Sequence, residues 1–268
     1  RAGAHDADRV LAGALAAGQY FDDDAPGEGE IRELAESLYR RADWQWAKTG
    51  GLTVTHGWTP EAGFLPYRWS GYAEAMLLYL LGIGSPTHPL PPQSYAAWTQ
   101  GFEWRRIYGV ELIFAGPLFI HQFSHIWIDF RDIRDAYMAR RDLDYFENSR
   151  RATYVHCRYA EDNPRNFKDY DGRCWGLTAC DGPGPLTLEV NGRERTFFGY
   201  RARGAPDGPD DGTVAPWAAI ASLPFAPELV IPTIRYLAET SYDKTSGYGF
   251  TCSFNPTLHK SAGDRGWM

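Results

Sequence analysis

The chain has 268 residues, of which 44% are hydrophobic and 15% aromatic, and it carries a formal net charge of −7. This length can bury one large core, so a single domain over residues 1–268 is expected. No block of Lys and Arg stands out, which disfavours a nucleic-acid partner, and no apolar run is long enough to predict a membrane partner. The acidic balance is typical of a soluble protein that acts on a neutral molecule.

Four cysteines occur without the C-x-x-C spacing of a zinc or redox motif: Cys157, Cys174, Cys180 and Cys252. A disulfide between Cys174 and Cys180 and free thiols in the core both remain open. The chain begins with Arg1 and shows no signal peptide, so it is read as a processed, trimmed or partial product. A periplasmic or secreted location is favoured over a cytoplasmic one.

The first third of the chain is mainly helical in pattern. Apolar residues at helical spacing predict helices over residues 8–21 and 28–47, the second with an apolar stripe that includes Leu34 and Leu38. A connection rich in Gly, Thr and Pro follows, and the alternation over residues 52–54 predicts a brief strand.

The next predicted helix starts at Ser70 as a cap and ends at Leu81, before Gly82. This helix is apolar on all sides, so it is expected to be buried. Glu74 lies inside it, and an unpaired buried carboxylate is costly. Glu74 therefore needs a partner, a raised pKa or a cavity, which favours a functional role over a structural ion pair.

The centre of the chain carries most of the candidate chemistry. Short helical pieces are expected over 92–102 and 114–124, and an amphipathic helix follows from Phe119. A second helix opens at Asp144-x-x-Glu147 and runs to about Tyr159. The Asp-x-x-Glu spacing is also a capping signal, so a capping role and a chemical role for Glu147 both stay open.

The last part of the chain contains the one predicted β excursion. Residues 186–200 form a strong hairpin signal with the turn at Asn191-Gly192, within an irregular segment that is typical of a lid or cleft wall. Helices return over 214–223 and 227–240, and residues 246–268 are expected to be loop-like. The fold class is therefore mainly α.

Motif spacing excludes several reaction types. His121-x-x-x-His125 would suit a metal, but no third ligand is evident, so neither a metal nor another cofactor is expected. Nucleophile elbows and dinucleotide-binding glycine motifs are absent. Carboxylates remain, and Glu74, Asp129 and Glu147 lie among aromatic residues. Glycoside hydrolysis needs a carboxylic acid of raised pKa and a second carboxylate, which this set offers.

Several motifs together resemble one bacterial family. They are Gly57-Trp58-Thr59-Pro60-Glu61, the segment from Trp69 to Tyr79, Gly84-Ser85-Pro86-Thr87-His88-Pro89, Gly116-Pro117-Leu118-Phe119, the segment from Tyr145 to Thr153, the segment from Trp175 to Gly182, Asp210-Asp211-Gly212-Thr213 and Pro224-Phe225-Ala226-Pro227-Glu228. The chain is similar, over about residues 31–256, to the bacterial "putative glucoamylase" family. That family includes endo-β-1,2-glucanases and is related to the glucoamylase-like domain of cyclic β-1,2-glucan synthases.

The resemblance implies an (α/α)6 barrel, incomplete in this chain, that hydrolyses β-1,2-glucan in a cleft at one barrel end. Glu147 matches the proposed general acid, and Glu74 matches a second acidic position that activates water. The saccharide would also meet a set of further residues, namely Glu61, Trp69, His121, His125, Asp129, Arg150, Arg151, Trp175 and Asp181. We expect Glu74 and Glu147 to face one aromatic-lined cavity. The alternatives are a transglycosylase and a catalytically silent glycan-binding module.

Overall fold

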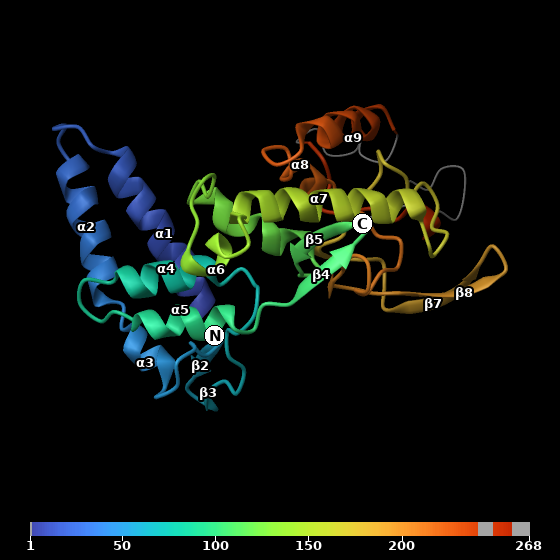
Figure 1. The fold of residues 1–268 in the computed structure, drawn as a ribbon. Coiled ribbons are helices and arrows are strands. Elements are labelled where there is room, and N and C mark those ends of the chain that lie inside the picture. Colours follow the sequence, from blue (N-terminus) through green and yellow to red (C-terminus); the bar gives the residue numbers. More distant parts are fainter. Residues whose placement is uncertain (1, 241–248, 259–268) are drawn as a thin grey trace. The chain divides into compact units, whose positions relative to one another are not determined.

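The computed structural model describes residues 2–240 and 249–258, with side chains described from residue 7 onward. The chain divides into two compact units (Figure 1). Unit 1 comprises Arg1–Glu103 and Ser124–Ile128, and unit 2 comprises Trp104–Phe123 and Asp129–Met268. The single domain over residues 1–268 stays a prediction.

After a short first strand, unit 1 has two neighbouring helices, α1 (Ala4–Tyr20) and α2 (Glu28–Arg41). The predicted first helix is confirmed, whereas the predicted helix over 28–47 is wrong. It ends at Arg41, and Asp43 caps a separate short helix, α3 (Trp44–Lys48), by accepting a hydrogen bond from the Trp46 backbone N–H at 2.9 Å. The predicted apolar stripe of α2 is not buried, because Leu34 and Leu38 are 57% and 44% exposed.

A small antiparallel sheet follows in unit 1, with β2 (Gly57–Thr59) between β1 (Ala2–Gly3) and β3 (Gly63–Phe64). The strand predicted over 52–54 is wrong. The Arg68 guanidinium holds that segment instead: its Nε donates to Thr53 Oγ1 at 2.9 Å, and a second nitrogen donates to the Thr53 carbonyl. These side-chain bonds take the place of a strand ladder.

The buried helix α4 (Met76–Gly84) packs beside α5 (Pro92–Thr99). The prediction that it begins at Ser70 and stops at Gly82 is wrong. Gly71 has φ +80°, outside the helical region, so the helix starts later and Glu74 lies half-buried in the preceding turn. Gly82 continues the helix, and the Leu90 side chain packs directly against it. A Cβ at this position would lie only 2.5 Å from Leu90 Cδ1, so a larger residue would clash.

Unit 2 opens with a hairpin of β4 (Trp104–Ile107) and β5 (Val110–Ile113), which the sequence patterns did not predict. With the β1–β2–β3 sheet of unit 1, it shows that the expectation of one β excursion was wrong. The predicted amphipathic helix from Phe119 is also wrong. Two 3₁₀ turns, η1 (Leu118–His121) and η2 (Phe123–Ile126), and the short α6 (Ala136–Ala139) take its place. The apolar residues that suggested a helix do not share a buried face, since Ile126 and Ile133 are 68% and 51% exposed.

Helix α7 (Tyr145–Asp162) is the longest described helix of unit 2, and the prediction that it opens at Asp144 is confirmed. The Asp144 side chain accepts a hydrogen bond from the Glu147 backbone N–H at 2.7 Å. A continuous set of buried residues that includes Ala152, Val155 and Tyr159 runs along one face of the helix and joins the core of unit 2.

The rest of unit 2 follows the predicted order. β7 (Leu186–Val190) and β8 (Arg193–Phe197) form the hairpin, and Asn191 and Gly192 at its turn have φ values of 54° and 72°, as a type I′ turn requires. A second antiparallel pair joins β6 (Ala179–Cys180) to β9 (Arg201–Ala202). Helices α8 (Pro216–Ile220) and α9 (Pro227–Glu239) confirm the two predicted late helices.

The C-terminal segment is described only over residues 249–258, where Val214 and Phe254 form an isolated bridge and Pro256–Leu258 is a 3₁₀ turn, η4. Most of the loop predicted over 246–268 lies outside the described residues. All four cysteines are free thiols, so the Cys174–Cys180 disulfide is not formed. In the described part of the chain, no helix has the length and apolar character needed to cross a membrane. The fold is helix-rich with short strands.

Candidate active site

One face of α7 carries four polar side chains that border a cavity. Glu147, Arg150, Arg151 and Tyr154 follow one another at the i, i+3, i+4 and i+7 spacing that places residues on one side of a helix. Together with Gly109, Val110 and Glu111 from the β4–β5 hairpin, they line a cavity of about 380 Å³ in unit 2. The wall is therefore built from one regular helix and one tight hairpin, both of which hold their side chains in fixed directions.

Glu147 is held in this cavity by two arginines. Arg151 Nε lies 3.0 Å from Glu147 Oε1, and Arg150 Nη1 lies 3.8 Å from Oε2. The Glu147 side chain remains 36% exposed, so it is open to a ligand. Among the described residues, the Glu147 carboxylate makes no bond back to the Asp144 backbone N–H. Its place in the cavity is thus not explained by capping.

A second set of contacts supports the arginines. Arg150 Nη2 lies 3.2 Å from Glu228 Oε1, and it also donates to Tyr154 Oη at 3.2 Å. Tyr154 Oη donates to the same Glu228 oxygen. The Tyr154 hydroxyl, together with Arg150, holds the pKa of the Glu228 carboxyl below its usual value. Glu228 at the start of α9 therefore fixes the side of Arg150 that faces away from Glu147.

Glu111 adds a second accessible carboxylate. Its Oε1 accepts from Arg141 Nη1 at 2.9 Å, and its backbone carbonyl accepts from Arg151 Nη1 at 2.7 Å. Our sequence reasoning assigned no role to Glu111 or Glu228. The motif Pro224-Phe225-Ala226-Pro227-Glu228 could have indicated the latter, whereas Glu111 lies in a hairpin that no pattern predicted. We call Glu111, Glu147, Arg150, Arg151, Tyr154 and Glu228 the Glu147 cluster.

The cluster offers carboxylates and hydrogen-bond donors but no metal-binding geometry. Ionised carboxylates accept hydrogen bonds and guanidinium groups donate them, so the cavity is suited to a ligand rich in hydroxyl groups. No group of three His, Cys, Asp or Glu that could hold a metal ion occurs within residues 2–240 and 249–258.

Four of the expected site residues belong to unit 1. Glu74 is half-buried before α4, Glu61 is exposed in the turn between β2 and β3, and the Trp69 ring stacks on His56 with centroids 4.0 Å apart. His125 is half-buried in η2. Since Glu147 belongs to unit 2, the cavity that Glu74 and Glu147 are expected to share stays a prediction.

The structure buries two of the residues that the resemblance placed along the cleft. Trp175 is fully buried and its Nε1 donates to Thr233 Oγ1 at 2.9 Å, which makes it part of the core of unit 2. His121 is also buried, with Nε2 3.1 Å from the Ala115 carbonyl oxygen. The expected helical face shared by His121 and His125 does not exist, because they lie in separate 3₁₀ turns.

Asp129 and Asp181 are exposed. Asp129 forms a fork-shaped ion pair with Arg131 two residues on, where Arg131 Nε lies 2.9 Å from Oδ1 and from Oδ2. At Asp181 it is the backbone carbonyl, rather than the carboxylate, that accepts from Ser253 Oγ at 2.8 Å. Neither residue is in the group that lines the Glu147 cavity.

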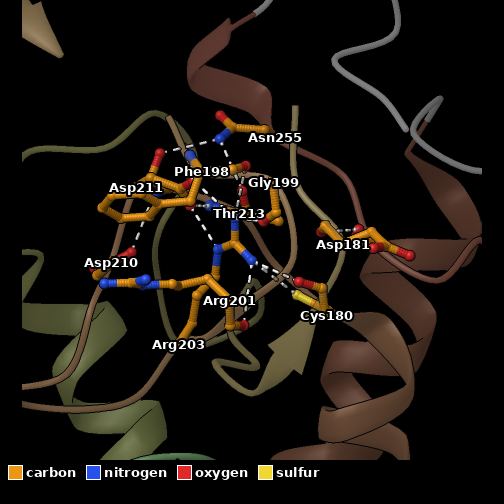
Figure 2. Close-up of polar contacts among 12 residues, drawn as sticks. Cys180, Asp181, Phe198, Gly199, Arg201, Arg203, Asp210, Asp211, Thr213 and Asn255 are labelled. Carbon is orange, nitrogen blue, oxygen red and sulfur yellow. Dashed lines mark hydrogen bonds and ion pairs between the residues drawn. The ribbon is translucent and has the colours of Figure 1, made fainter. Parts of the chain in front are cut away.

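Two further aspartates form a separate, buried polar site. Arg203 Nε lies 2.7 Å from Asp211 Oδ1, and its Nη2 lies 2.8 Å from Oδ2, with both side chains fully buried (Figure 2). The guanidinium also donates to the carbonyls of Cys180, Phe198 and Gly199. Burial alone would raise the pKa of Asp211, but the Arg203 hydrogen bonds and charge outweigh it and lower the pKa.

Asp210 is the neighbouring member of this buried site. Its carboxylate accepts from Tyr159 Oη and Tyr170 Oη, each at 2.9 Å, and from the Gly212 backbone N–H at 3.0 Å. Burial raises the pKa of Asp210. We call Tyr159, Tyr170, Arg203, Asp210 and Asp211 the Arg203 network. Because Asp210 and Asp211 are 4% and 1% exposed, the network ties loops to α7 and is closed to a ligand.

Comparisons with known proteins give one consistent result. The sequence model of the family described as "Putative glucoamylase" matches residues 66–268. The chain is 27% identical over 279 residues to an exo β-1,2-glucooligosaccharide sophorohydrolase (non-reducing end) of Parabacteroides distasonis, with 93% of this chain and 36% of that protein covered. The chain thus spans just over a third of the length of that relative.

Solved structures show the same likeness. A "putative glucoamylase" of Bacteroides uniformis is similar with a TM-score of 0.80 and 32% identity, covering 92% of this chain and 58% of that one. An endo-β-1,2-glucanase of Chitinophaga pinensis, solved with sophorotriose and glucose, is similar with a TM-score of 0.80 and 25% identity, covering 97% of this chain and 59% of that one. This chain therefore corresponds to roughly three fifths of each of these structures.

Proposed function

The chain belongs to the family described as "Putative glucoamylase", and from this premise we propose that the protein hydrolyses β-1,2-linked glucan. The observation that carries the proposal is the position of Glu147, an accessible carboxylate on a regular helix that lines a cavity with a second carboxylate, Glu111. The activities of two relatives support the choice of linkage: the Parabacteroides distasonis protein is a β-1,2-glucooligosaccharide sophorohydrolase, and the Chitinophaga pinensis protein is an endo-β-1,2-glucanase.

In this proposal Glu147 protonates the oxygen of the leaving sugar, and Glu74 activates water directly or through a relay. Arg150 and Arg151 beside Glu147 hold its carboxyl group in the cavity. A glucan that fills the cavity would exclude water from this group, and Glu147 would then donate its proton to the glycosidic oxygen that it contacts. Arg150 has an alternative anionic partner in Glu228, so it can release Glu147 without losing its own ion pair.

The proposal extends to the fold and to the other expected contacts. We propose that the helices described above belong to an (α/α)6 barrel, which is consistent with the helix-rich fold of this chain. Arg150 and Arg151 are the expected substrate contacts that line the Glu147 cavity. Glu61, Trp69, His125, Asp129 and Asp181 stay predictions, as does a periplasmic or secreted location.

The experiment is an incubation of the protein with linear β-1,2-glucan, with new reducing ends measured and products separated by chromatography. Short β-1,2-linked oligosaccharides should accumulate, and neither starch nor β-1,3-glucan should be cleaved at a comparable rate. Binding of β-1,2-glucan without any new reducing ends would contradict hydrolysis and identify a silent binding module. Products longer than the substrate, or cyclic ones, would instead identify a transglycosylase.

A further inference from the structure

Unit 1 contains a second cavity, which has no role in the chemistry above. Its volume is about 230 Å³, and its wall is mainly apolar, with four aromatic residues. The lining comes from α1, from α3 and the two residues before it, from Thr55 and from the β2–β3 hairpin, and consists of Ala7, Leu11, Ala42, Asp43, Trp44, Trp46, Ala47, Thr55, Gly57, Trp58 and Phe64. We call it the aromatic cavity.

Local structure explains how the rings are placed. The Asp43 cap starts α3, which turns Trp44 inward to 4% exposure and Trp46 outward to 53%. In the adjacent sheet, the β2–β3 register sets Trp58 directly opposite Phe64. The Trp46 ring centroid lies 4.5 Å from that of Phe64 and 6.1 Å from that of Trp58. Three rings from two separate segments thus form one continuous wall.

The aromatic side chains of this wall are exposed to solvent, and this exposure does not stabilise the folded chain. Trp58 is 37% exposed and Trp46 is 53% exposed, although both are large apolar side chains that gain free energy on burial. Grouped exposed aromatics of this kind mark binding surfaces, and tryptophan presents a flat apolar face together with a polar N–H.

One polar group on the same cavity has spare hydrogen-bonding capacity. Asp43 is exposed, and its Oδ1 accepts from the Trp46 backbone N–H, while Oδ2 has no hydrogen-bond partner among the described residues. A carboxylate oxygen beside exposed aromatic rings can accept a hydrogen bond from a hydroxyl group of a ligand. The Trp44 indole Nε1 also lacks a partner within residues 2–240 and 249–258, but it is buried and therefore not accessible to a ligand.

We propose that the aromatic cavity is a binding subsite for one pyranose ring of the glucan. The C–H face of the ring stacks on Trp58 beside Trp46, and one sugar hydroxyl donates to Asp43. The volume lies just below the ~300–1,000 Å³ of ordinary ligand pockets, which suits one ring better than a longer segment. The identity of the sugar rests on the proposed function, whereas the subsite rests on the cavity itself.

The test measures binding without turnover. In the Glu147→Gln protein, the Kd for a β-1,2-linked glucooligosaccharide is measured by isothermal titration calorimetry, with and without Trp58→Ala. Loss of one stacking platform should weaken binding roughly tenfold. Trp217→Ala is the matched control, because Trp217 on α8 is 36% exposed and lies outside the cavity, and its Kd should stay unchanged.

A second pair of measurements keeps the test decisive if Trp58→Ala fails to fold. Asp43→Asn preserves the helix cap but removes the charged acceptor, so it should weaken binding while thermal stability is maintained. The Trp44 indole N–H resonance, assigned with Trp44→Phe, should shift on addition of the sugar. An unchanged Kd in the folded Trp58 and Asp43 variants, or an unshifted Trp44 resonance at saturation, would overturn the subsite.

The two proposals fail in different ways. If the Glu147→Gln protein, with all the residues of the aromatic cavity intact, does not bind β-1,2-linked oligosaccharide at all, the proposed substrate is wrong. If it binds, and the parent protein releases reducing ends, but the aromatic-cavity variants bind equally well, hydrolysis stands and only the subsite is refuted.

Discussion

Two groups of charged residues in unit 2 consist of the same kinds of side chain, but one lines a cavity and the other stabilises the fold. The Glu147 cluster lies on the open face of α7, and the Arg203 network joins the buried face through Tyr159. Glu147 and Arg150 are 36% and 42% exposed, whereas Arg203 and Asp211 are fully buried. Exposed ion pairs contribute about 0–1 kcal/mol to stability, but a buried charge that loses its partner costs several.

This difference in burial indicates which carboxylates can contact a ligand. In the Glu147 cluster, Arg150 can exchange partners between Glu147 and Glu228 at little cost, so a ligand can rearrange the contacts. In the Arg203 network every contact is fixed by burial, and its loss would loosen the loops around β6 and β9. Four measurements sharpen this contrast.

The largest effect is expected at Glu147. Glu147→Gln should lower the rate of β-1,2-glucan hydrolysis by about 10²–10⁴-fold, because general-acid catalysis of that size is removed. The free energy of unfolding should change by about 1 kcal/mol or less, since only exposed ion pairs are lost. Reducing-end assays and urea denaturation measure the two quantities on the same preparation.

The control for Glu147 lies on the same helix. Glu161 pairs with Arg158 at 2.7 Å on the surface of α7, so Glu161→Gln should leave both the rate and the stability nearly unchanged. A stable Glu147→Gln protein with near-normal turnover would show that Glu147 is not the acid, and the search would move to Glu74 or Asp129.

The second effect is expected at Asp211, where a substitution should lower stability but leave turnover unchanged. Asp211→Asn leaves the buried Arg203 charge without its partner and should lower the free energy of unfolding by about 3–5 kcal/mol. Turnover per folded molecule should remain close to that of the parent protein. Urea midpoints together with activity at low temperature test both statements, and a loss of less than 1 kcal/mol would mean that water reaches this pair.

The third effect concerns pH and the buried face of α7. Burial, with the neighbouring His121, lowers the pKa of His156 from 6.5 to about 3. Between pH 6.5 and pH 3, His156 therefore binds a proton in the unfolded chain but not in the folded chain. The free energy of unfolding consequently decreases as the pH falls from 6.5 towards 3. Between pH 7 and pH 4 this amounts to about 3 kcal/mol.

His156→Gln removes the titrating group, so the readout is the slope of unfolding free energy against pH rather than its absolute value. The variant should lose most of the decline between pH 7 and pH 4 that the parent shows. Equal slopes in the two proteins would mean that His156 is protonated in the folded state.

The smallest effect is expected at Glu228, which touches Glu147 only through Arg150. Glu228→Gln leaves Arg150 with Glu147 as its remaining charged partner, so the Glu147 carboxyl group should be less free to turn towards the leaving oxygen. We expect a decrease in turnover of about tenfold. Tyr154→Phe, which removes the neighbouring hydroxyl but no charge, should lower turnover less. Unaltered turnover in Glu228→Gln would separate Glu228 from catalysis.

Sequence patterns were sufficient for the features that depend on local backbone preferences. The Asp144 cap fixed the start of α7, the Asn191-Gly192 pair fixed the hairpin turn, and periodicity placed α1 and α9. Each depends on a few adjacent residues, whose backbone preferences act whatever surrounds them. The combined motifs also led to the correct family, because several of them had to match at once.

Tertiary structure alone decided which residues are open to a ligand. Glu147 and Asp211 are both acidic residues within recognised motifs, yet the first lines a cavity and the second is sealed against Arg203. Trp175 fills the core while Trp58 remains exposed, although both occur in Gly-rich segments with similar composition. The burial of a residue depends on which distant parts of the chain pack against it, so it cannot be predicted from the neighbouring residues in the sequence.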